Sequence, residues 1–210
     1  MRRSSCLACD ENVGASASDP GTPPGRKNEW TTELEAALER GDPDAMLRLA
    51  RPKSGRVLRY LAGRLVSASE EEKWRAVRGL GVVVGDRQIV SHDRATDLLR
   101  RFFWALNEES GAVPYGMPEA IGEILAVRPE LQGDFLPILC ALATDEDMLQ
   151  TGPIERGVLW ALGRVGPPVG RCSPGAVEAV AAAAGKHPDP ETRKVAGRSL
   201  TLLIGGHADP

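Results

Sequence analysis

Aromatic residues, cysteines and long apolar runs are all scarce in this 210-residue chain. Aromatics account for 4% of the residues, and because β-sandwiches favour aromatic and β-branched side chains, an all-β fold is disfavoured. The four cysteines do not form the dense framework of a small secreted domain, so we expect reduced thiols and a cytoplasmic protein. No run approaches the roughly 18 apolar residues of a membrane-spanning helix, so no membrane contact is expected.

A basic excess is missing as well, since the formal net charge is -3 at pH 7. Proteins that hold a phosphate backbone usually carry a basic excess or a basic stripe, so nucleic acid is not an expected partner. The three histidines are scattered and do not form the His-Glu pairs that helical-repeat metal hydroxylases use, so a metal-dependent oxygenase is disfavoured too.

Residues 1–28 contain Ser, Gly, Pro, Asp and Asn and almost no large apolar side chain. Such a segment cannot bury enough apolar surface to offset its chain entropy, so we expect a disordered N-terminal arm. Cys6 and Cys9 have the spacing of half a zinc site, but such a site needs further ligands, and the nearest histidine is His92. We therefore expect no metal and no cofactor, and one helical domain over residues 29–210.

That domain contains an internal repeat. Four octets match: RGLGVVVG from Arg78, EAIGEILA from Glu119, WALGRVGP from Trp160 and RSLTLLIG from Arg198. Their starts lie about 40 residues apart, a period typical of helical-pair repeats. Three positions are apolar in every copy: the third and sixth residues of the octet, and the residue two before its first. These positions share one helix face. These columns are Leu80, Ile121, Leu162 and Leu200; Val83, Ile124, Val165 and Leu203; and Ala76, Met117, Val158 and Ala196. Position two is small in every copy, which lets helices approach closely: Gly79, Ala120, Ala161 and Ser199.

The repeat also predicts where helices begin. One residue at a matching position upstream of each octet is of a type that caps helix N-termini. These residues are Ser69, Ser110, Thr151 and Asp189. Partner helices are expected at about 87–107, 129–143 and 175–185. Antiparallel helix pairs with this period stack into a right-handed α-solenoid, so the sequence predicts an all-α fold of that kind.

The segment DPETRKVAGRSL, from Asp189 to Leu200, resembles the opening helix of a HEAT repeat of the phycobilisome-lyase type, Asp-Pro-x-x-Arg-x-x-Ala followed by Leu. The resemblance extends over roughly residues 69–204. The segment FFWALNEESGAVPYGMPEAIGEIL, from Phe102 to Leu125, is similar to a segment of some bacterial HEAT-like proteins. The first resemblance implies bilin lyases or protein-interaction scaffolds, and the second implies no particular activity.

The second repeat breaks the pattern between Ser110 and Pro118. Two glycines and two prolines there do not support a regular helix, so we expect a loop or distorted turn, with helix resuming at Pro118. Glu108 and Glu109 end the preceding helix, where the helix dipole disfavours carboxylates. Local conflicts of this kind are expected at functional sites. The candidate binding residues are therefore Trp104, Asn107, Glu108, Glu109, Tyr115 and Glu119.

Three interpretations of this segment remain open. Aromatic anchors flanked by acids suit a basic partner, which favours a non-enzymatic protein-interaction or scaffold module. Alternatively, the glutamates line the pocket of a cofactor-handling or lyase-like enzyme that binds a small molecule or tetrapyrrole in a concave face. No nucleophile stands with a base and an orienting group, so no catalytic residue is assigned. In the plainest interpretation, Trp104 is a core residue and Asn107 caps its helix.

Overall fold

The computed structural model describes residues 29–106, 115–144 and 152–205. Within these ranges the chain is helical and contains no strand, which confirms the predicted all-α class. No helix in them is both long and apolar enough to cross a membrane. The predicted N-terminal arm, residues 1–28, lies outside the described residues.

Eleven α-helices and one 3-10 turn follow one another in the described residues. They are α1 (Glu29–Arg40), α2 (Pro43–Ala50), α3 (Ser54–Arg64), α4 (Glu70–Gly85), α5 (His92–Leu106), α6 (Met117–Val127), η1 (Pro129–Leu131), α7 (Gln132–Thr144), α8 (Gly152–Val165), α9 (Pro168–Cys172), α10 (Pro174–Lys186) and α11 (Pro190–Leu203). Local chemistry explains many starts. At α2, for example, Asp42 Oδ1 accepts a hydrogen bond from the backbone N–H of Ala45 at 3.0 Å, and Pro43 needs no hydrogen-bond partner.

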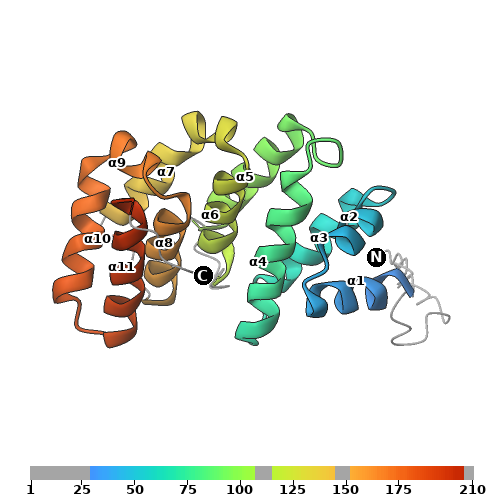
Figure 1. The fold of residues 1–210 in the computed structure, drawn as a ribbon, viewed down its shortest axis with the longest axis horizontal. Helices are drawn as coiled ribbons and strands as arrows, with labels where there is room; N and C mark the ends of the chain where they lie inside the picture. Colours follow the sequence, from blue (N-terminus) through green and yellow to red (C-terminus); the bar gives the residue numbers. More distant parts are fainter. Residues whose placement is uncertain (1–28, 107–114, 145–151, 206–210) are drawn as a thin grey trace, which may run out of the picture.

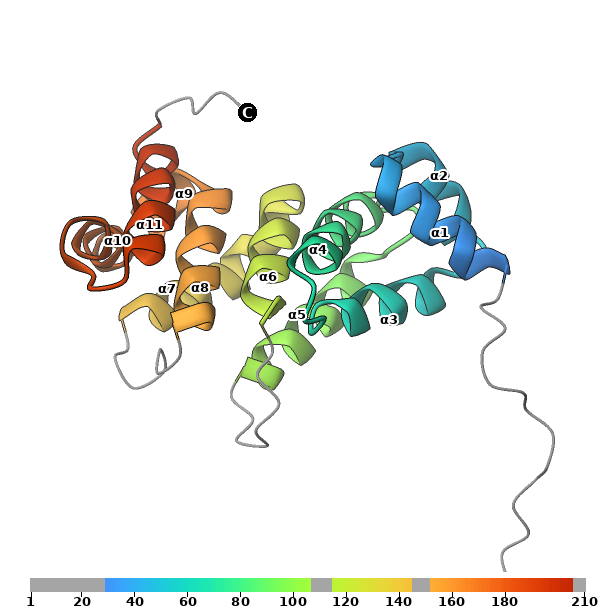
Figure 2. The same ribbon diagram turned by 90° about the horizontal axis from the view of Figure 1, so that it is seen from below.

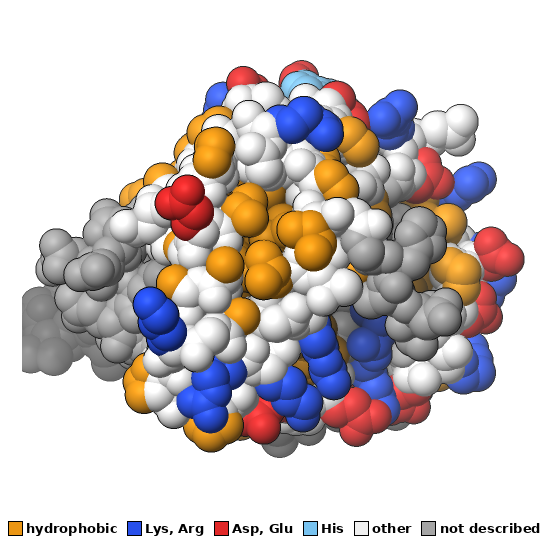
Figure 3. Space-filling model, turned by 60° about the vertical axis from the view of Figure 1, so that its left-hand side comes forward, with side chains coloured by type: hydrophobic (Ala, Val, Ile, Leu, Met, Phe, Trp, Pro, Cys, Tyr) orange, Lys and Arg blue, Asp and Glu red, His pale blue; other side chains and the backbone are white. Residues whose placement is uncertain are grey.

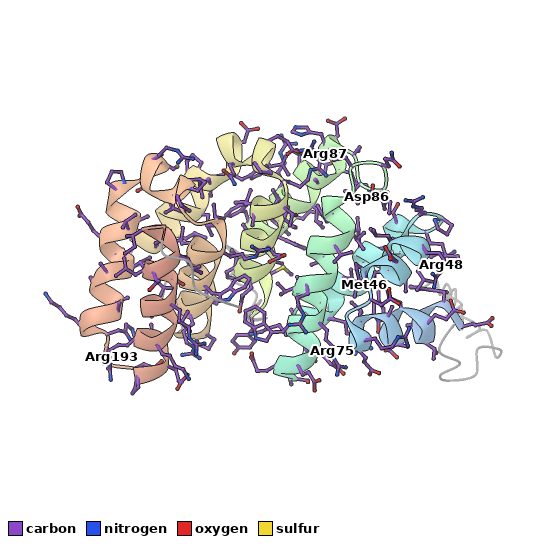
Figure 4. All side chains as sticks on the ribbon, in the orientation of Figure 1. Met46, Arg48, Arg75, Asp86, Arg87 and Arg193 are labelled. Carbon is purple, nitrogen blue, oxygen red and sulfur yellow. The ribbon has the colours of Figure 1, made fainter. Side chains whose placement is uncertain are left out.

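The four repeats form helices α4, α6, α8 and α11, which lie side by side in that order (Figure 1). In Figure 4, Arg75 near the start of α4 and Arg193 near the start of α11 lie along the same edge of the molecule. Asp86 and Arg87, which follow α4, lie at the opposite edge. The helices of this row therefore run in the same direction, and equivalent repeat positions stand at similar heights.

A second set of helices packs behind the row (Figure 2). Helix α3 packs against α4, α5 against α6, α7 against α8, and α10 against α11. The predicted partner helices correspond to α5, α7 and α10. Helices α5 and α7 begin later than predicted because a short turn and η1 occupy the expected starts. Helices α1 and α2 pack against α4.

The apolar columns of the repeat form the core, as the periodicity predicts. All of them are buried except Met117 and Leu200, which are half-buried and pack against the same core. The small column is buried in every repeat. Burying one large apolar side chain contributes roughly 1.5–3 kcal/mol, so the stacked columns are a main source of stability.

Glycines bring the backbones of α6, α8 and α11 together. A Cβ added to Gly122 of α6 would lie 2.5 Å from Ala161 Cα on α8. Similarly, a Cβ added to Gly163 of α8 would lie 2.5 Å from Ser199 Oγ on α11. The small residue at position two of one repeat thus meets the glycine at position four of the repeat before it. The predicted close approach is confirmed, and it needs both residues.

The contact between α4 and α6 includes polar side chains as well: a Cβ added to Gly81 of α4 would meet Glu123 of α6, whereas one added to Gly85 would meet Val127. At the end of this junction, Arg128 is fully buried, and its Nη1 donates to the carbonyl oxygens of Val84 at 2.8 Å and Val90 at 3.0 Å. Its Nε donates to Glu130. Burial by itself would raise the pKa of Glu130, but hydrogen bonds from Arg128, its own backbone N–H and Arg87 outweigh it and lower the pKa to about 2.

Two of the four predicted helix caps are confirmed. Ser69 accepts a hydrogen bond from a backbone N–H in the first turn of α4, and Asp189 does so in the first turn of α11. Ser110 and Thr151 lie outside the described residues. Helix α6 begins at Met117, one residue before the predicted start.

Candidate functional site

The N-terminal parts of the four row helices surround a pocket of about 620 Å³. They meet there because the helices run in the same direction. We name this pocket the acid-lined compartment. Its lining residues are Glu70, Lys73 and Trp74 of α4, Tyr115 and Glu119 at the start of α6, Pro153, Arg156 and Trp160 of α8, and Asp189, Glu191 and Val195 at the start of α11.

Two tryptophans meet at one side of this compartment. Trp74 of α4 and Trp160 of α8 form an edge-to-face pair with ring centroids 4.8 Å apart. Their helices are not neighbours in the row, since α6 lies between them (Figure 1). The two side chains therefore reach each other across α6. Such pairs are worth about 0.5–1.5 kcal/mol beyond area burial and hold the rings in place. Both residues are only partly buried, which leaves ring surface available to a ligand.

A buried ion pair lies beside the tryptophans. Lys73 Nζ is 3.3 Å from Glu119 Oε1 and 2.8 Å from Glu70 Oε2, and it lies 5.1 Å from the centroid of the Trp74 ring. Lys73 is 6% exposed and Glu119 is 3% exposed, whereas Glu70 is largely in solvent. Burial raises the pKa of Glu119 and outweighs the opposing effect of the Lys73 charge. This carboxyl group therefore holds a proton more tightly than an exposed glutamate does.

The second oxygen of Glu119 has no partner. Glu119 Oε2 is buried and accepts no hydrogen bond. It lies against Gly157 of α8, where an added Cβ would be 2.7 Å from it. A buried polar atom without a partner costs about 1–3 kcal/mol. Unfavourable local features are expected at functional sites, so Glu119 is the strongest single candidate in the pocket.

A second pocket of about 490 Å³ adjoins the first and shares Trp74 and Trp160 with it. Its other lining residues are Val77, Arg78, Glu123 and Arg164. Arg164 donates to both carboxylate oxygens of Glu123, at 2.6 and 3.1 Å. Arg78 is exposed, and no salt bridge joins it to another described residue. We name this pocket the arginine-lined compartment, and the two compartments together the groove.

Two of the six predicted binding residues, Tyr115 and Glu119, line the groove. Trp104 lies on α5, is 65% exposed and is not part of the lining. The prediction of the plainest interpretation that Trp104 is a core residue is therefore wrong, whereas the predicted cap Asn107 lies outside the described residues. The other three predicted residues, Asn107, Glu108 and Glu109, lie outside the described residues.

Sequence reasoning missed most of the groove, although the repeat contained a signal for it. The relevant positions are the first of each octet and the one four residues earlier, which share a helix face. These residues are Arg78, Glu119, Trp160 and Arg198, and Trp74, Tyr115, Arg156 and Lys194. Six of the eight line the groove. These positions vary among aromatic, acidic and basic residues, unlike the uniform core columns.

A hollow of about 360 Å³ between α1, α3 and α4 is a weaker candidate. Its polar groups already bind one another: the Tyr60 hydroxyl donates to Glu35 at 2.5 Å, and Arg64 donates to Glu35 at 2.9 Å and to Glu72 at 3.2 Å. The side of the molecule near α10, turned forward in Figure 3, shows apolar side chains at its centre and charged ones around its margin. An apolar surface can pack against a protein but does little to orient a charged ligand.

The groove lining contains no serine, cysteine or histidine. No group of three or more His, Cys, Asp or Glu residues in the described ranges is placed to hold a metal ion. Elsewhere, Cys140 and Cys172 form no disulfide, and burial together with the neighbouring Cys172 raises the pKa of the Cys140 thiol to about 12. The described part of the groove therefore offers charge and aromatic surface rather than a nucleophile with its base.

No protein-family model matches the chain. No curated protein matches it either. Among solved structures, an engineered protein whose crystal structure comes from the Northeast Structural Genomics Consortium has a TM-score of 0.46 and 17% sequence identity, over 84% of this chain and 78% of that chain. A likeness at this level carries no argument about fold or function. The case for a function rests on the residues of the groove.

Proposed function

We propose that this chain is a non-enzymatic protein-interaction module built on HEAT-like repeats, which binds a partner protein in the groove. The observation that carries the proposal is the Trp74–Trp160 pair, which meets over α6 and is surrounded by charged side chains. Tryptophan is enriched among the residues that dominate binding energy at interfaces. The 104–119 segment contributes Tyr115 and Glu119 to this surface.

The architecture within this proposal is a right-handed α-solenoid of antiparallel helix pairs. Three features support it: the period of about 40 residues, the row of helices running in one direction, and the second helix packed behind each of them. The resemblance to a HEAT repeat adds local support. In its Asp-Pro-x-x-Arg motif, Asp189 caps α11 and Arg193 Nη1 donates to the carbonyl oxygens of His187 and Pro188.

The chemistry of the lining favours binding over catalysis. Among the carboxylates of the groove, Glu119 is paired with Lys73, and Glu123 accepts hydrogen bonds from Nε and Nη2 of Arg164. Neither group has a serine, cysteine or histidine beside it in the groove lining. Aromatic rings and fixed charges on a rigid set of helices are the components of a recognition surface.

The test is to capture partners from native lysate with the full chain and with two matched variants, Trp160→Ala in the groove and Trp104→Ala on α5. Every protein that is captured is then purified, and its affinity for each form is measured by calorimetry. We expect Trp160→Ala to lose at least tenfold in affinity, because truncating a central aromatic anchor commonly costs 2 kcal/mol or more (about thirtyfold). Trp104→Ala should bind as the wild type does.

Circular dichroism and a thermal melt must show that both variants are folded. If Trp104→Ala loses the partner and Trp160→Ala keeps it, the binding surface lies at the end of α5 and outside the groove. If no protein binds the wild type reproducibly, the interaction module is rejected.

A cofactor-handling or lyase-like enzyme is the second candidate, and the size of the acid-lined compartment favours it. Its volume of about 620 Å³ falls within the range of small-molecule sites, roughly 300–1,000 Å³. A linear tetrapyrrole stacked on the Trp74–Trp160 pair would quench tryptophan fluorescence. Titration with biliverdin therefore tests this candidate: saturable quenching that Trp160→Ala abolishes supports it, and unchanged fluorescence rejects it for that ligand class.

A further inference from the structure

The two compartments of the groove carry opposite charge. Four carboxylates and two cations line the acid-lined compartment, whereas two guanidinium groups and one carboxylate line the arginine-lined compartment. The Trp74–Trp160 pair belongs to both and so lies between the two charged ends. A ligand that crosses the tryptophans therefore meets acidic groups at one end and basic groups at the other.

Internal pairing does not cancel this difference. In the acid-lined compartment, Lys73 is shared by Glu70 and Glu119, so two carboxylates face one ammonium group. Arg156 is matched by Asp189 at 3.0 Å. Glu191 is paired with Lys194, which lies outside the lining, at 3.8 Å. One negative charge is left over after these pairs are counted.

An excess of positive charge remains in the arginine-lined compartment. Arg164 and Glu123 neutralise each other through two hydrogen bonds. Arg78 is exposed and forms no salt bridge within the described ranges. Its guanidinium group is therefore available to a carboxylate from outside the chain.

The spacing of Glu70, Trp74 and Arg78 along α4 matches the spacing of alternate side chains in an extended peptide. An α-helix rises 1.5 Å per residue, so Glu70 and Arg78 are separated by roughly 12 Å along the helix axis, with Trp74 midway. An extended chain rises about 3.3 Å per residue and places alternate side chains on the same face. Residues i, i+2 and i+4 of such a segment span roughly 13 Å, which brings one side chain to each level.

We propose that the groove binds an extended segment of the partner protein with a basic residue at i, an apolar residue at i+2 and an acidic residue at i+4. The basic side chain enters the acid-lined compartment, the apolar one lies on the Trp74–Trp160 pair, and the acidic one binds Arg78. This specificity rests on the proposed function. Charge complementarity selects a segment of mixed charge over nucleic acid, whose uniform negative charge would meet the excess carboxylates.

The test is nitrogen–proton NMR of the full chain, which observes the indole N–H signals of its four tryptophans. Signals are assigned with single Trp→Phe variants. The probe is a blocked peptide containing Arg-Ser-Leu-Ser-Glu, compared with peptides in which both charged residues are Arg or both are Glu. We expect the mixed-charge peptide to shift the signals of Trp74 and Trp160 and to leave Trp30 and Trp104 unchanged. It should bind at least about fivefold more tightly than either like-charge peptide, as expected for a lost charge pair at a partly open site.

A charge reversal sharpens the test. Arg78→Glu should weaken the mixed-charge peptide about fivefold or more and make the Arg-Ser-Leu-Ser-Arg peptide the preferred ligand. The matched control is Arg100→Glu on α5, which reverses another exposed arginine outside the groove and should change neither affinity. Arg78 has no partner to lose in the described structure, so this variant is expected to fold normally.

Three results would overturn the inference: equal binding of all three peptides, shifts at all four indoles, or an unchanged preference in Arg78→Glu. Movement of the groove signals with protein concentration alone would identify a second copy of the chain as the occupant and would also reject it. If Trp160→Ala loses a captured partner while Arg78→Glu leaves peptide preference unchanged, the interaction module stands and only the charge pattern fails.

Discussion

The junction between α4 and α6 differs from the junctions that join α6, α8 and α11. In the latter, glycine lets backbone and small side chains touch: Gly122 faces Ala161, and Gly163 faces Ser199. Gly81 of α4 holds the same repeat position as Gly122, yet it faces the side chain of Glu123.

This difference shows how one repeat yields both a scaffold and a site. At Gly122 and Gly163 no room is left for a larger side chain, so these contacts serve packing, whereas Glu119 and Glu123 contact α8 elsewhere along its junction with α6. Between α4 and α6, the acid-lined compartment opens beside the charged side chains of Lys73 and Glu119. A few substitutions within the same repeat register therefore give the α4–α6 junction a different role from the α6–α8 and α8–α11 junctions.

The largest expected effect comes from breaking the buried ion pair of the α4–α6 junction. Lys73→Met leaves the Glu119 carboxylate buried without a counter-charge, and we expect a loss of about 3–5 kcal/mol in the free energy of unfolding. Adding Glu119→Gln should recover most of that loss, because the uncompensated charge is then removed. Urea unfolding of the two single variants and the double variant measures the coupling. Additive losses would show that the pair is not a unit.

Alanine at the two equivalent glycines tests the two kinds of junction directly. Gly122→Ala should lower the free energy of unfolding by about 2–3 kcal/mol, because its Cβ would overlap the backbone of Ala161. Gly81→Ala should stay within about 1 kcal/mol of wild type, since the Glu123 side chain can move and alanine favours a helix. Chemical denaturation compares them, and equal losses would contradict the proposed difference between the junctions.

The two ends of the α4–α6 junction should respond to pH in opposite directions. The pKa of Glu130 is lowered to about 2 in the folded chain, so its stabilising contribution is present above the unfolded pKa of about 4.5 and is lost as pH falls through 2. The pKa of Glu119 is raised, so its contribution is greatest below the unfolded pKa and is lost as pH rises through the folded pKa.

Unfolding of Glu130→Gln and Glu119→Gln across the pH range checks these signs. The stability deficit of Glu130→Gln should be largest near neutral pH and should close toward pH 2. Wild type should gain stability relative to Glu119→Gln as pH falls from 7 toward 4.5. Parallel pH profiles for the two variants would show that the two carboxyl groups share one environment.

The smallest effect is expected at the exposed ion pair between α6 and α8. Arg164 is 43% exposed in its side chain, so its bond with Glu123 is screened by solvent. Arg164→Ala should therefore lower the free energy of unfolding by less than about 1 kcal/mol. A thermal melt at low and high salt is sufficient, and a loss as large as that of Gly122→Ala would mean that the polar contact carries the junction.

Much of the fold could be predicted from the sequence because its causes are local and periodic. Leu80 and its equivalents, the Ser69 and Asp189 caps and the partner helices follow from spacing along one chain, and the structure confirms each of them. The site was predicted less well. The broken repeat drew attention to residues 104–119, and of the predicted binding residues that the structure describes there, Tyr115 and Glu119 line the groove and Trp104 does not.

The sequence by itself determined an all-helical chain with a repeating core, since burial of apolar columns at a helical period depends only on residue type and spacing. Tertiary structure decided the site. Trp74 and Trp160 belong to different repeats and to repeat positions four residues apart, so they meet only because α4 and α8 pack on either side of α6. The burial of Glu119 beside Lys73 likewise depends on how far apart two helices stand, and helix separation is set by contacts between repeats rather than by the pattern within one.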